Sequence, residues 1–473
     1  NKMAVTISID QEPLYELAPV GFPLIYTVSD ATVVATYFNV SYAAEVYISK
    51  VPVTFLASEL VGTFKTTPNN VGSGIFDFSS IVESYVKADN LAFTKAAFKI
   101  TTVATATDTF PIHLIDKFSR NTNSLVYLKI KFVAYGAATA SVAPVQVNDK
   151  ETSTERQMFN SYIKETDNID SLSNDFGFDT NIFHQEEVVA VGDKLGELYT
   201  NAPYEQDVLE NDYHTIGFNS VDQGATNTWT QARFTFFDGS TNLGFDSFSR
   251  TLTNGAWTTY DDTAGENLCF VGVGTANLKG WSTVYNGYLT AGTTVTHYTV
   301  QLAKAGARDV MQPSRFNIKC NSLKGFEPIR LCWLNQWGCW DYFTFNMKSI
   351  KSIKTNGSTY NQLEGTWNEA SYKLDSYKGG KKSFRVNANE MVRINTDFIN
   401  EDKSVMFQEL INSPEIYILE GFQNDTTNSS FNKYVTPVRL TTSSFTTKTV
   451  ANDKLIQYTL EVEKSKTLRT QSV

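Results

Sequence analysis

The sequence predicts a mainly β protein made of several antiparallel β domains with a few short helices. Phe and Tyr are abundant, with 32 and 23 residues in a chain of 473, and both favour sheets over helices. Hydrophobic residues make up 41% and charged residues 19%, which is typical of folded globular proteins. A chain of this length has room for roughly two to four domains, each with its own core.

Residues 1–140 are predicted to form the first domain, a β-sandwich of immunoglobulin-like or fibronectin-like type. The prediction depends on about six or seven β-rich stretches at the spacing typical of such sandwiches. Ser80 and Glu83 fit a capping box, which predicts a short helix over residues 81–86. The expected strands are residues 4–9, 22–27, 36–49, 75–78, 96–103 and 125–134.

Residues 141–190 are polar and acidic, and few strand signals occur there. Met158, Phe159, Tyr162 and Ile163 recur at the spacing of one helical face, which predicts a short amphipathic helix. We interpret the segment as a linker. The alternative is an arm that becomes ordered only against a partner, because a long stretch without a core of its own is either functional or disordered.

Residues 191–346 are predicted to form a middle β domain, closed by a hairpin rich in large aromatic residues. Residues 329–334 are a near-continuous apolar run, residues 335–338 have turn chemistry, and residues 339–345 bring the chain back. Strands that are apolar on both faces are covered on both faces, so we expect this hairpin inside the protein or under a neighbouring subunit, as the central pair of its sheet. The predicted core residues are Trp333, Trp337, Trp340, Phe343 and Phe345, and truncation of Trp333 or Trp340 is expected to cost about 3–5 kcal/mol.

Residues 347–473 are predicted to form a basic C-terminal β domain with one helix. Residues 379–380, two consecutive glycines, are expected to make a turn between two short strands. Asn400 fits the N-cap of the best helix candidate in the chain, and Pro414 is its expected terminator.

The charge of the chain is unevenly distributed. The formal net charge is −10, which argues against a dedicated nucleic-acid binder because such a protein needs a basic footprint. Residues 1–140 carry −1, residues 141–312 carry −14 and residues 313–473 carry +5. One interpretation is a solvated acidic surface in the middle region; the other is electrostatic complementarity between the acidic and basic regions of adjacent subunits.

No catalytic, cofactor-binding or metal-binding motif is recognisable in the sequence. The four cysteines (Cys269, Cys320, Cys332 and Cys339) lack Cys-x-x-Cys spacing and the four histidines are scattered, so buried free thiols are expected rather than a zinc site. No apolar run approaches the roughly 20 residues of a membrane span. The first residues are expected to begin directly as a strand and not as a signal peptide.

Two features keep a glycan-related function open. Adjacent carboxylates occur at residues 186–187 and 261–262, and a glycosidase needs two carboxyl groups about 5–10 Å apart; adjacency in sequence does not establish that geometry. Trp257 and Trp281 are the candidates for contact with a sugar, although aromatic residues in β domains are more often part of the core.

An ordered series of motifs runs through most of the chain and is most specific in the aromatic hairpin. The motifs are Val-Thr-Ile-Ser-Ile from Val5, Gly-Ile-Phe-Asp-Phe-Ser-Ser-Ile-Val from Gly74, Leu-Tyr-Thr-Asn-Ala-Pro from Leu198, Pro-Ile-Arg-Leu-Cys-Trp-Leu-Asn-Gln-Trp-Gly-Cys-Trp-Asp-Tyr-Phe from Pro328, and Glu-Leu-Ile-Asn-Ser-Pro-Glu-Ile-Tyr-Ile from Glu409. With these motifs, the chain resembles virion structural proteins of tailed bacteriophages that infect Bacteroidota, including crAss-like and flavobacterial phages.

The resemblance implies a non-enzymatic building block of the tail, baseplate or neck, without cofactors and with no catalytic residues to carry over. Its expected partners are copies of itself and other virion proteins, and its expected location is the virion, assembled in the host cytoplasm. Two alternatives stay open: a receptor-binding or glycan-binding adhesin at the tail tip that contacts host surface glycan, and a tail enzyme that degrades polysaccharide.

Overall fold

The structure is a computed structural model, and it forms two compact units. Unit 1 comprises residues 1–319, 334–341 and 421–431, and unit 2 comprises residues 320–333, 342–420 and 432–473. The chain is mainly β, as predicted, with several antiparallel sheets and short helices. The structure describes residues 7–13, 17–92, 110–121, 123–162, 198–220, 231–249, 267–304, 308–309, 313–320, 325–366, 369–420, 434–442 and 456–469.

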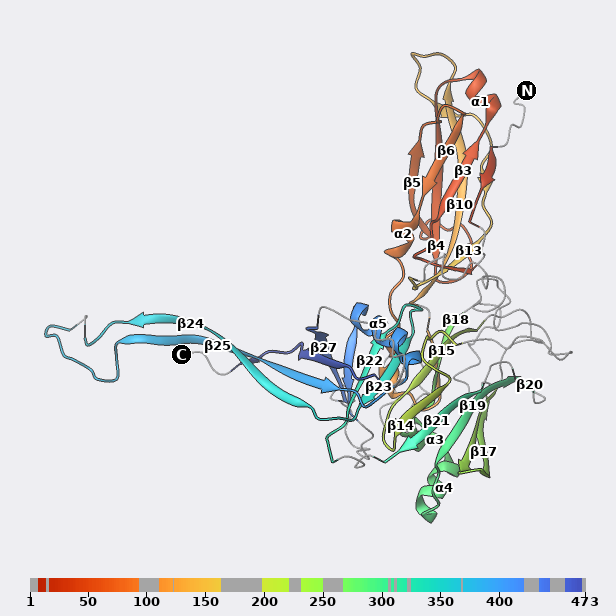
Figure 1. The fold of residues 1–473 in the computed structure, drawn as a ribbon. Coiled ribbons are helices and arrows are strands. Elements are labelled where there is room, and N and C mark those ends of the chain that lie inside the picture. Colours follow the sequence, from red (N-terminus) through yellow and green to blue (C-terminus); the bar gives the residue numbers. More distant parts are fainter. Residues whose placement is uncertain are drawn as a thin grey trace. The chain divides into compact units, whose positions relative to one another are not determined.

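The N-terminal part of unit 1 contains two sheets (Figure 1), and aromatic side chains of the two sheets are in contact. Tyr26 and Phe76 from the smaller sheet contact Phe132 of the larger one, with ring centroids 5.7 and 5.6 Å apart. The smaller sheet has the order β1 (Ser8–Gln11), β3 (Ile25–Ser29), β6 (Ser73–Asp77). The larger has the order β2 (Leu17–Pro19), β13 (Arg156–Phe159), β10 (Leu125–Ala137), β4 (Phe38–Ser49), β5 (Leu60–Thr66), with β11 (Val145–Gln146) and β12 (Glu151–Thr152) also on β10.

The predicted boundary at residue 140 is wrong, because strands β11, β12 and β13 return along β10. Met158 and Phe159, expected on a helix, lie in β13 opposite Val126 and Leu125. Both are buried, since the sheet offers their side chains an apolar face that an isolated helix would lack. Residues 163–190 of the predicted linker lie outside the described part of the chain.

The two helices of this part are short. Helix α1 spans Ala31–Thr36 and begins at Asp30, whose carboxylate accepts a 3.0 Å hydrogen bond from the Val33 N–H. Helix α2 spans Ser79–Glu83, and the predicted capping box is absent because its N-cap is Phe78. The Ser79 hydroxyl instead accepts a hydrogen bond from the N–H of Leu24, which connects the helix to the chain before β3.

The middle part of unit 1 contains two larger sheets. Predicted boundaries fail here too, because β9 (Phe118–Asn121) comes from the predicted first domain yet pairs with β18 (Asn267–Gly272) of the predicted middle domain. One sheet has the order β14 (Glu205–Leu209), β21 (Ser314–Lys319), β19 (His297–Lys304), β16 (Gln231–Asp238), β17 (Thr241–Ser249), with β20 (Arg308–Asp309) on β19. The other has the order β15 (Thr215–Ser220), β18 (Asn267–Gly272), β9 (Phe118–Asn121). The remaining elements are β7 (Leu91–Ala92), β8 (Phe110–Pro111), the 3-10 turn Ile112–Leu114, α3 (Thr275–Trp281) and α4 (Thr283–Ala291).

Unit 2 is organised around one eight-stranded sheet. Its order is β23 (Trp340–Phe345), β22 (Ile329–Leu334), β26 (Ile416–Leu419), β27 (Val435–Leu440), β28 (Thr459–Lys464), β25 (Gly380–Asn395), β24 (Ile350–Gln362), with β29 (Leu468–Arg469) on β25. The helix predicted after Asn400 exists as a 3-10 turn, Glu401–Lys403, followed by α5, Ser404–Asn412. Asn400 makes no side-chain cap hydrogen bond, in contrast to the prediction.

The aromatic hairpin is formed by β22 and β23, with the predicted turn, but its predicted place in the fold is wrong. It joins the sheet of unit 2 through β26 and stands at one end of the strand order, with β23 outermost. Every residue of β22 is buried. In unit 2 the Phe407 ring of α5 contacts Trp333, Phe343 and Phe345, so a helix covers part of the hairpin.

Candidate functional site

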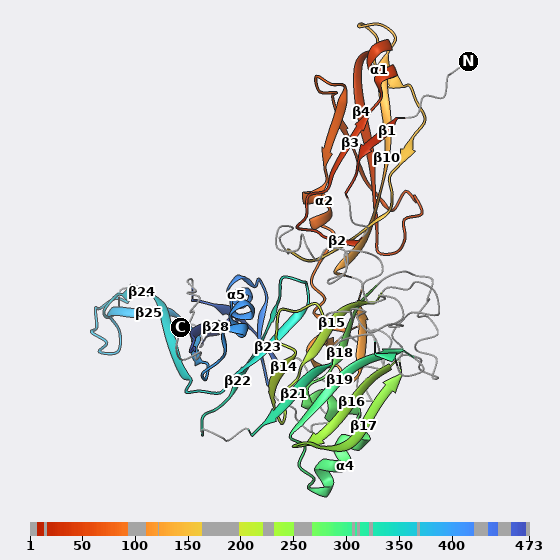
Figure 2. The same ribbon diagram turned by 45° about the vertical axis from the view of Figure 1, so that its right-hand side comes forward.

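The most exposed element of unit 2 is a long β-ribbon, residues 350–388, which we call the arm. It consists of β24, the connection 363–379 and the first half of β25, and it extends away from the rest of the sheet of unit 2 in both views (Figure 1, Figure 2). The first ten residues of β24 are all exposed. At about 3.3 Å per residue, its 13 residues span about 40 Å.

The two strands of the arm are in continuous antiparallel register, from Ile350 opposite Arg393 to Gln362 opposite Gly380, with one bulge after Ser358. Gly379 and Gly380 both have positive φ, 96° and 74°. The predicted glycine turn therefore exists as a bend into β25, but the strands it joins are 13 and 16 residues long instead of short.

The connection at the tip of the arm is held by its own hydrogen bonds. The N–H of Thr366 donates to the carbonyl of Lys373 over 3.0 Å, and the N–H of Lys373 donates to the Thr366 hydroxyl over 2.9 Å. Large apolar side chains nevertheless stay in water there, with exposed fractions from 66% to 71%. These tip residues are Leu363, Tyr372, Leu374 and Tyr377.

The arm also leaves a sheet edge open. Within the described residues β24 is the last strand of its sheet and pairs only with β25. An unpaired edge of this length presents a row of backbone N–H and C=O groups that can accept another strand. Folded proteins protect such edges with charges or cover them with a partner, and β24 carries Lys351 and Lys354.

The predicted core residues of the hairpin are not surface groups. Trp333, Trp337, Trp340 and Phe345 are buried, and Phe343 is half-buried. In unit 1, the Trp337 ring stacks on Tyr199 at 5.7 Å between centroids, and its indole N–H donates to Asn201. The motifs that are most specific in the sequence thus build cores.

The described residues give no support to the predicted contacts with a glycan. Trp257 lies outside the described residues, as do the carboxylate pairs at 186–187 and 261–262. Trp281 ends α3 with its ring packed edge-on against Phe234 and Phe248. Its indole nitrogen is buried without a hydrogen-bond partner among the described residues, so the ring serves packing and does not form an open platform for a sugar.

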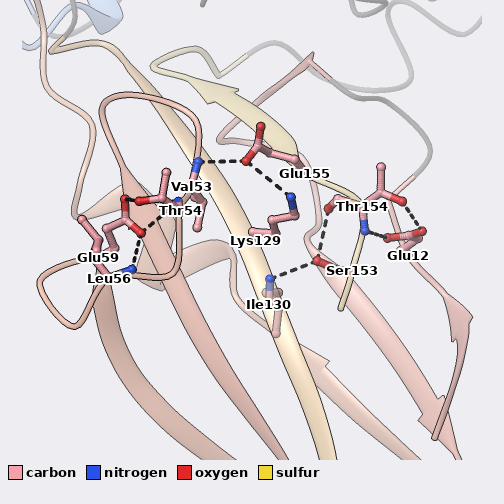
Figure 3. A network of polar contacts seen from close by, with 10 residues as sticks. All are labelled: Glu12, Val53, Thr54, Leu56, Glu59, Lys129, Ile130, Ser153, Thr154 and Glu155. Carbon is pink, nitrogen blue, oxygen red and sulfur yellow. Dashed lines mark hydrogen bonds and ion pairs between the residues drawn. The ribbon is translucent and has the colours of Figure 1, made fainter. Parts of the chain in front are cut away.

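A network of carboxylates in the N-terminal part of unit 1 forms a second polar site (Figure 3). Glu59 accepts hydrogen bonds from the backbone N–H groups of Thr54 and Leu56 and from the Thr54 hydroxyl. Burial would raise the pKa of Glu59, but these donated hydrogen bonds outweigh it and hold the pKa below its ordinary value.

Two more carboxylates of the network have the same kind of role (Figure 3). Glu155 accepts from the N–H of Val53 over 2.9 Å and faces Lys129 at 3.9 Å. Glu12 accepts from both the N–H and the hydroxyl of Thr154. Because each carboxylate is engaged by donors of nearby loops and strands, the network fixes the loop 51–59 and the chain before β13.

Thiols and histidines form no metal centre among the described residues. The four cysteines are present as thiols; Cys269, Cys332 and Cys339 are buried, as predicted, whereas Cys320 is exposed, in contrast to the prediction. His113 is buried and meets Trp340 edge-on at 4.7 Å, and burial lowers its pKa to about 3. No helix in the described part of the chain is long and apolar enough to cross a membrane.

Sequence reasoning missed the arm, although two signals for it exist. Residues 350–388 carry seven Lys or Arg and three Asp or Glu. The stretch 350–359 also contains only two apolar side chains, Ile350 and Ile353, among polar and charged ones, a composition typical of a strand that is not buried on either face.

Comparison with known proteins gives no further constraint. No protein-family model matches the chain, and a search of curated proteins found no match.

Proposed function

We propose that this protein is a non-enzymatic structural subunit of a tailed-bacteriophage particle, in the tail, baseplate or neck, and that it assembles with copies of itself and with other virion proteins. The observation that carries the proposal is the arm. A two-stranded ribbon that exposes both faces is marginally stable at best in water, so such a ribbon gains stability when a partner covers it. The resemblance of the sequence motifs to phage structural proteins supports the same role.

Other features of the described residues support a building block rather than a catalyst. The carboxylates of the network in Figure 3 serve backbone and hydroxyl donors, a structural use of acidic groups. The two N-terminal sheets, with facing aromatic residues, fit an immunoglobulin-like or fibronectin-like sandwich. Domains of this kind present edges and loops to neighbours in large assemblies, whose interfaces commonly bury more than about 2,000 Å².

The proposal is tested by the mass of the purified full chain, measured by light scattering or native mass spectrometry at low and high salt. We expect a closed multimer, as symmetric contacts between identical subunits produce. A variant in which residues 358–385 are replaced by Asn-Gly keeps the register at Gly357 and Val386 and closes the ribbon with a favourable two-residue turn.

This shortened variant is expected to be monomeric and still folded, with a cooperative thermal transition. The proposal fails if the intact chain is monomeric at both salt concentrations and binds no component of a particle, or if the shortened variant assembles as well as the intact chain.

A further inference from the structure

The arm has two open edges, and only one of them is protected. Beyond the pairs that it forms with β28 and β29, β25 has no second neighbour along residues 380–386 among the described residues. This edge carries Lys381, Lys382 and Arg385, and Phe384 is an extra residue that forms a bulge there. Charges and bulges are the devices by which sheet edges avoid further pairing.

The edge of β24 lacks these devices over most of its length. Its two charges, Lys351 and Lys354, lie within its first five residues, and residues 355–362, Thr-Asn-Gly-Ser-Thr-Tyr-Asn-Gln, carry none. These residues also contain no Pro, and the bulge of the ribbon lies in the other strand. In the described part of the chain only β25 pairs with β24. An uncharged edge without a bulge is expected to take up another strand.

The sequence of β24 favours a second copy of the same strand as the occupant. When two copies of a strand pair antiparallel about a two-fold axis, the residue at the axis faces itself, and each residue before it faces one after it. Asn356 is the middle of the 13 residues, so with Asn356 at the axis the two copies overlap over their full length. Lys351 then faces Asn361 of the second copy. Lys354 faces Ser358 of that copy, so no two lysines oppose each other.

The direction of the pair follows from the same charges. A parallel pair in register would place each lysine opposite its own counterpart, and like charges directly opposite each other are destabilising. In the antiparallel pair the cations of the two β25 strands are separated by three strand spacings, about 14 Å. Exposed charges are largely screened beyond about 8 Å at physiological ionic strength, so these cations do not prevent the contact.

We propose that β24 pairs antiparallel with β24 of a second copy of this chain, about a two-fold axis at Asn356, so that the two arms form one four-stranded sheet. The inference rests on the proposed function and specifies which strand makes the contact, in which direction and in which register. The contact also stabilises the arm itself. A two-stranded ribbon is marginally stable at best in water, and additional strands are part of what makes a sheet stable on its own.

Cross-linking at the axis tests the register. The background is Cys320→Ser, which removes the exposed native thiol. Asn356→Cys places thiols on directly opposed residues, whose Cα atoms are about 4.5–5.5 Å apart in an antiparallel pair, within the range of a disulfide. The control Ser352→Cys is on the same face and also exposed, but its counterpart lies about 27 Å away. With oxidised glutathione as the oxidant, we expect a covalent dimer from Asn356→Cys and none from the control.

Moving a charge tests the same register without a cross-link. Asn361→Lys puts a lysine opposite Lys351 of the second copy at both ends of the contact, and we expect about 10-fold weaker self-association. Lys351→Asn/Asn361→Lys restores the net charge and leaves the new lysine facing a neutral residue, so association is expected to recover. An effect of the new lysine within its own arm would not recover, because positions 351 and 361 of one strand are about 33 Å apart.

The outcomes separate this inference from the proposed function. If the intact chain assembles and the shortened chain is monomeric, but Asn356→Cys gives no covalent dimer or no more than Ser352→Cys, the inference is overturned and the proposed function stands. It is also overturned if Lys351→Asn/Asn361→Lys associates as weakly as Asn361→Lys. Binding of the β24 edge to a strand of another virion protein, without self-association, would overturn it as well.

Discussion

The indole N–H of Trp340 donates a 2.9 Å hydrogen bond to the backbone carbonyl of Asp89, 251 residues earlier in the chain. Both residues are buried. The carboxylate of Asp89 in turn accepts from the hydroxyl and the N–H of Ser124, the residue before β10. The start of β23 is thereby fixed, within unit 1, to the N-terminal sheets.

Trp340→Phe is expected to destabilise the protein by about 1–3 kcal/mol, because the buried carbonyl of Asp89 loses its indole donor. The free energy of unfolding in urea measures the effect. Trp281→Phe is the matched control: it also shortens a packed indole, yet the Trp281 nitrogen has no hydrogen-bond partner among the described residues. Equal losses from the two substitutions would show that the hydrogen bond contributes nothing beyond packing.

His113 makes stability depend on pH. Burial lowers its pKa to about 3, from an ordinary value of 6.5. Between these values the unfolded chain binds a proton that the folded protein does not, so this residue contributes a loss of stability as pH falls below 6.5, at about 1.4 kcal/mol per pH unit. His113→Phe keeps an aromatic ring beside Trp340 and removes the proton site.

The measurement is the free energy of unfolding of both proteins between pH 4 and pH 7. The free energy of unfolding of the intact protein is expected to fall relative to that of His113→Phe as the pH is lowered from 7 to 4. The reason is that only the chain with His113 takes up a proton on the imidazole when it unfolds. Parallel curves would mean that His113 has the same pKa in the folded protein as in the unfolded chain, which would contradict its burial.

The hairpin shows what a sequence predicts well. Its strands and turn were predicted within a residue or two, because they depend on local patterns: apolar residues at 329–334, turn residues at 335–338 and aromatic residues beyond. Its position was not predicted, because β22 pairs with β26, about 85 residues later, and no local pattern records which distant strand completes a sheet. The cover from Phe407 is a tertiary contact of the same kind.

The arm was not predicted, and the reason is different. Hydrophobic periodicity detects an element by the face that it buries, and a ribbon with no buried face gives no such signal. The β11–β13 strands were missed for a related reason: they are two to four residues long, too short for alternation to stand out from a polar segment.

Glu59→Gln is expected to destabilise the protein by about 1–3 kcal/mol and to speed amide hydrogen exchange at Thr54 and Leu56, since a charged acceptor binds these donors more strongly than a neutral amide. The lowered pKa of Glu59 means that its contribution is present above the ordinary carboxyl pKa and is lost as pH falls through the folded-state pKa. Asp149→Asn, at an exposed position, is the control. Unchanged exchange in the Glu59 variant would exclude this role.

One thiol per chain is expected to react rapidly with a thiol reagent in the native protein, and four after unfolding. Cys320 is exposed, whereas Cys269, Cys332 and Cys339 are buried, and burial raises the pKa of Cys332 and Cys339 well above the ordinary value, so little reactive thiolate forms. Cys320→Ser should abolish the rapid phase. Early labelling of Cys339, detected by peptide mapping, would contradict the burial of the hairpin.

Gly338, in the hairpin turn, is expected to tolerate no side chain. Its φ is +78°, which costs a residue with a Cβ about 1–2 kcal/mol, and a Cβ there would overlap the backbone carbonyl oxygen of Asn160. Gly239, in the turn between β16 and β17, separates the two causes: its φ is +57°, but a Cβ would meet nothing within 4 Å.

Gly239→Ala should therefore cost about 1 kcal/mol from backbone strain alone, whereas Gly338→Ala should cost about 2–5 kcal/mol, because overpacking against a backbone atom adds to the same strain. Urea unfolding of both variants measures the difference. If the two losses were equal, the hairpin turn would be free to move away from Asn160, and the contacts of Trp337 and Trp340 beside it would not hold the turn in place.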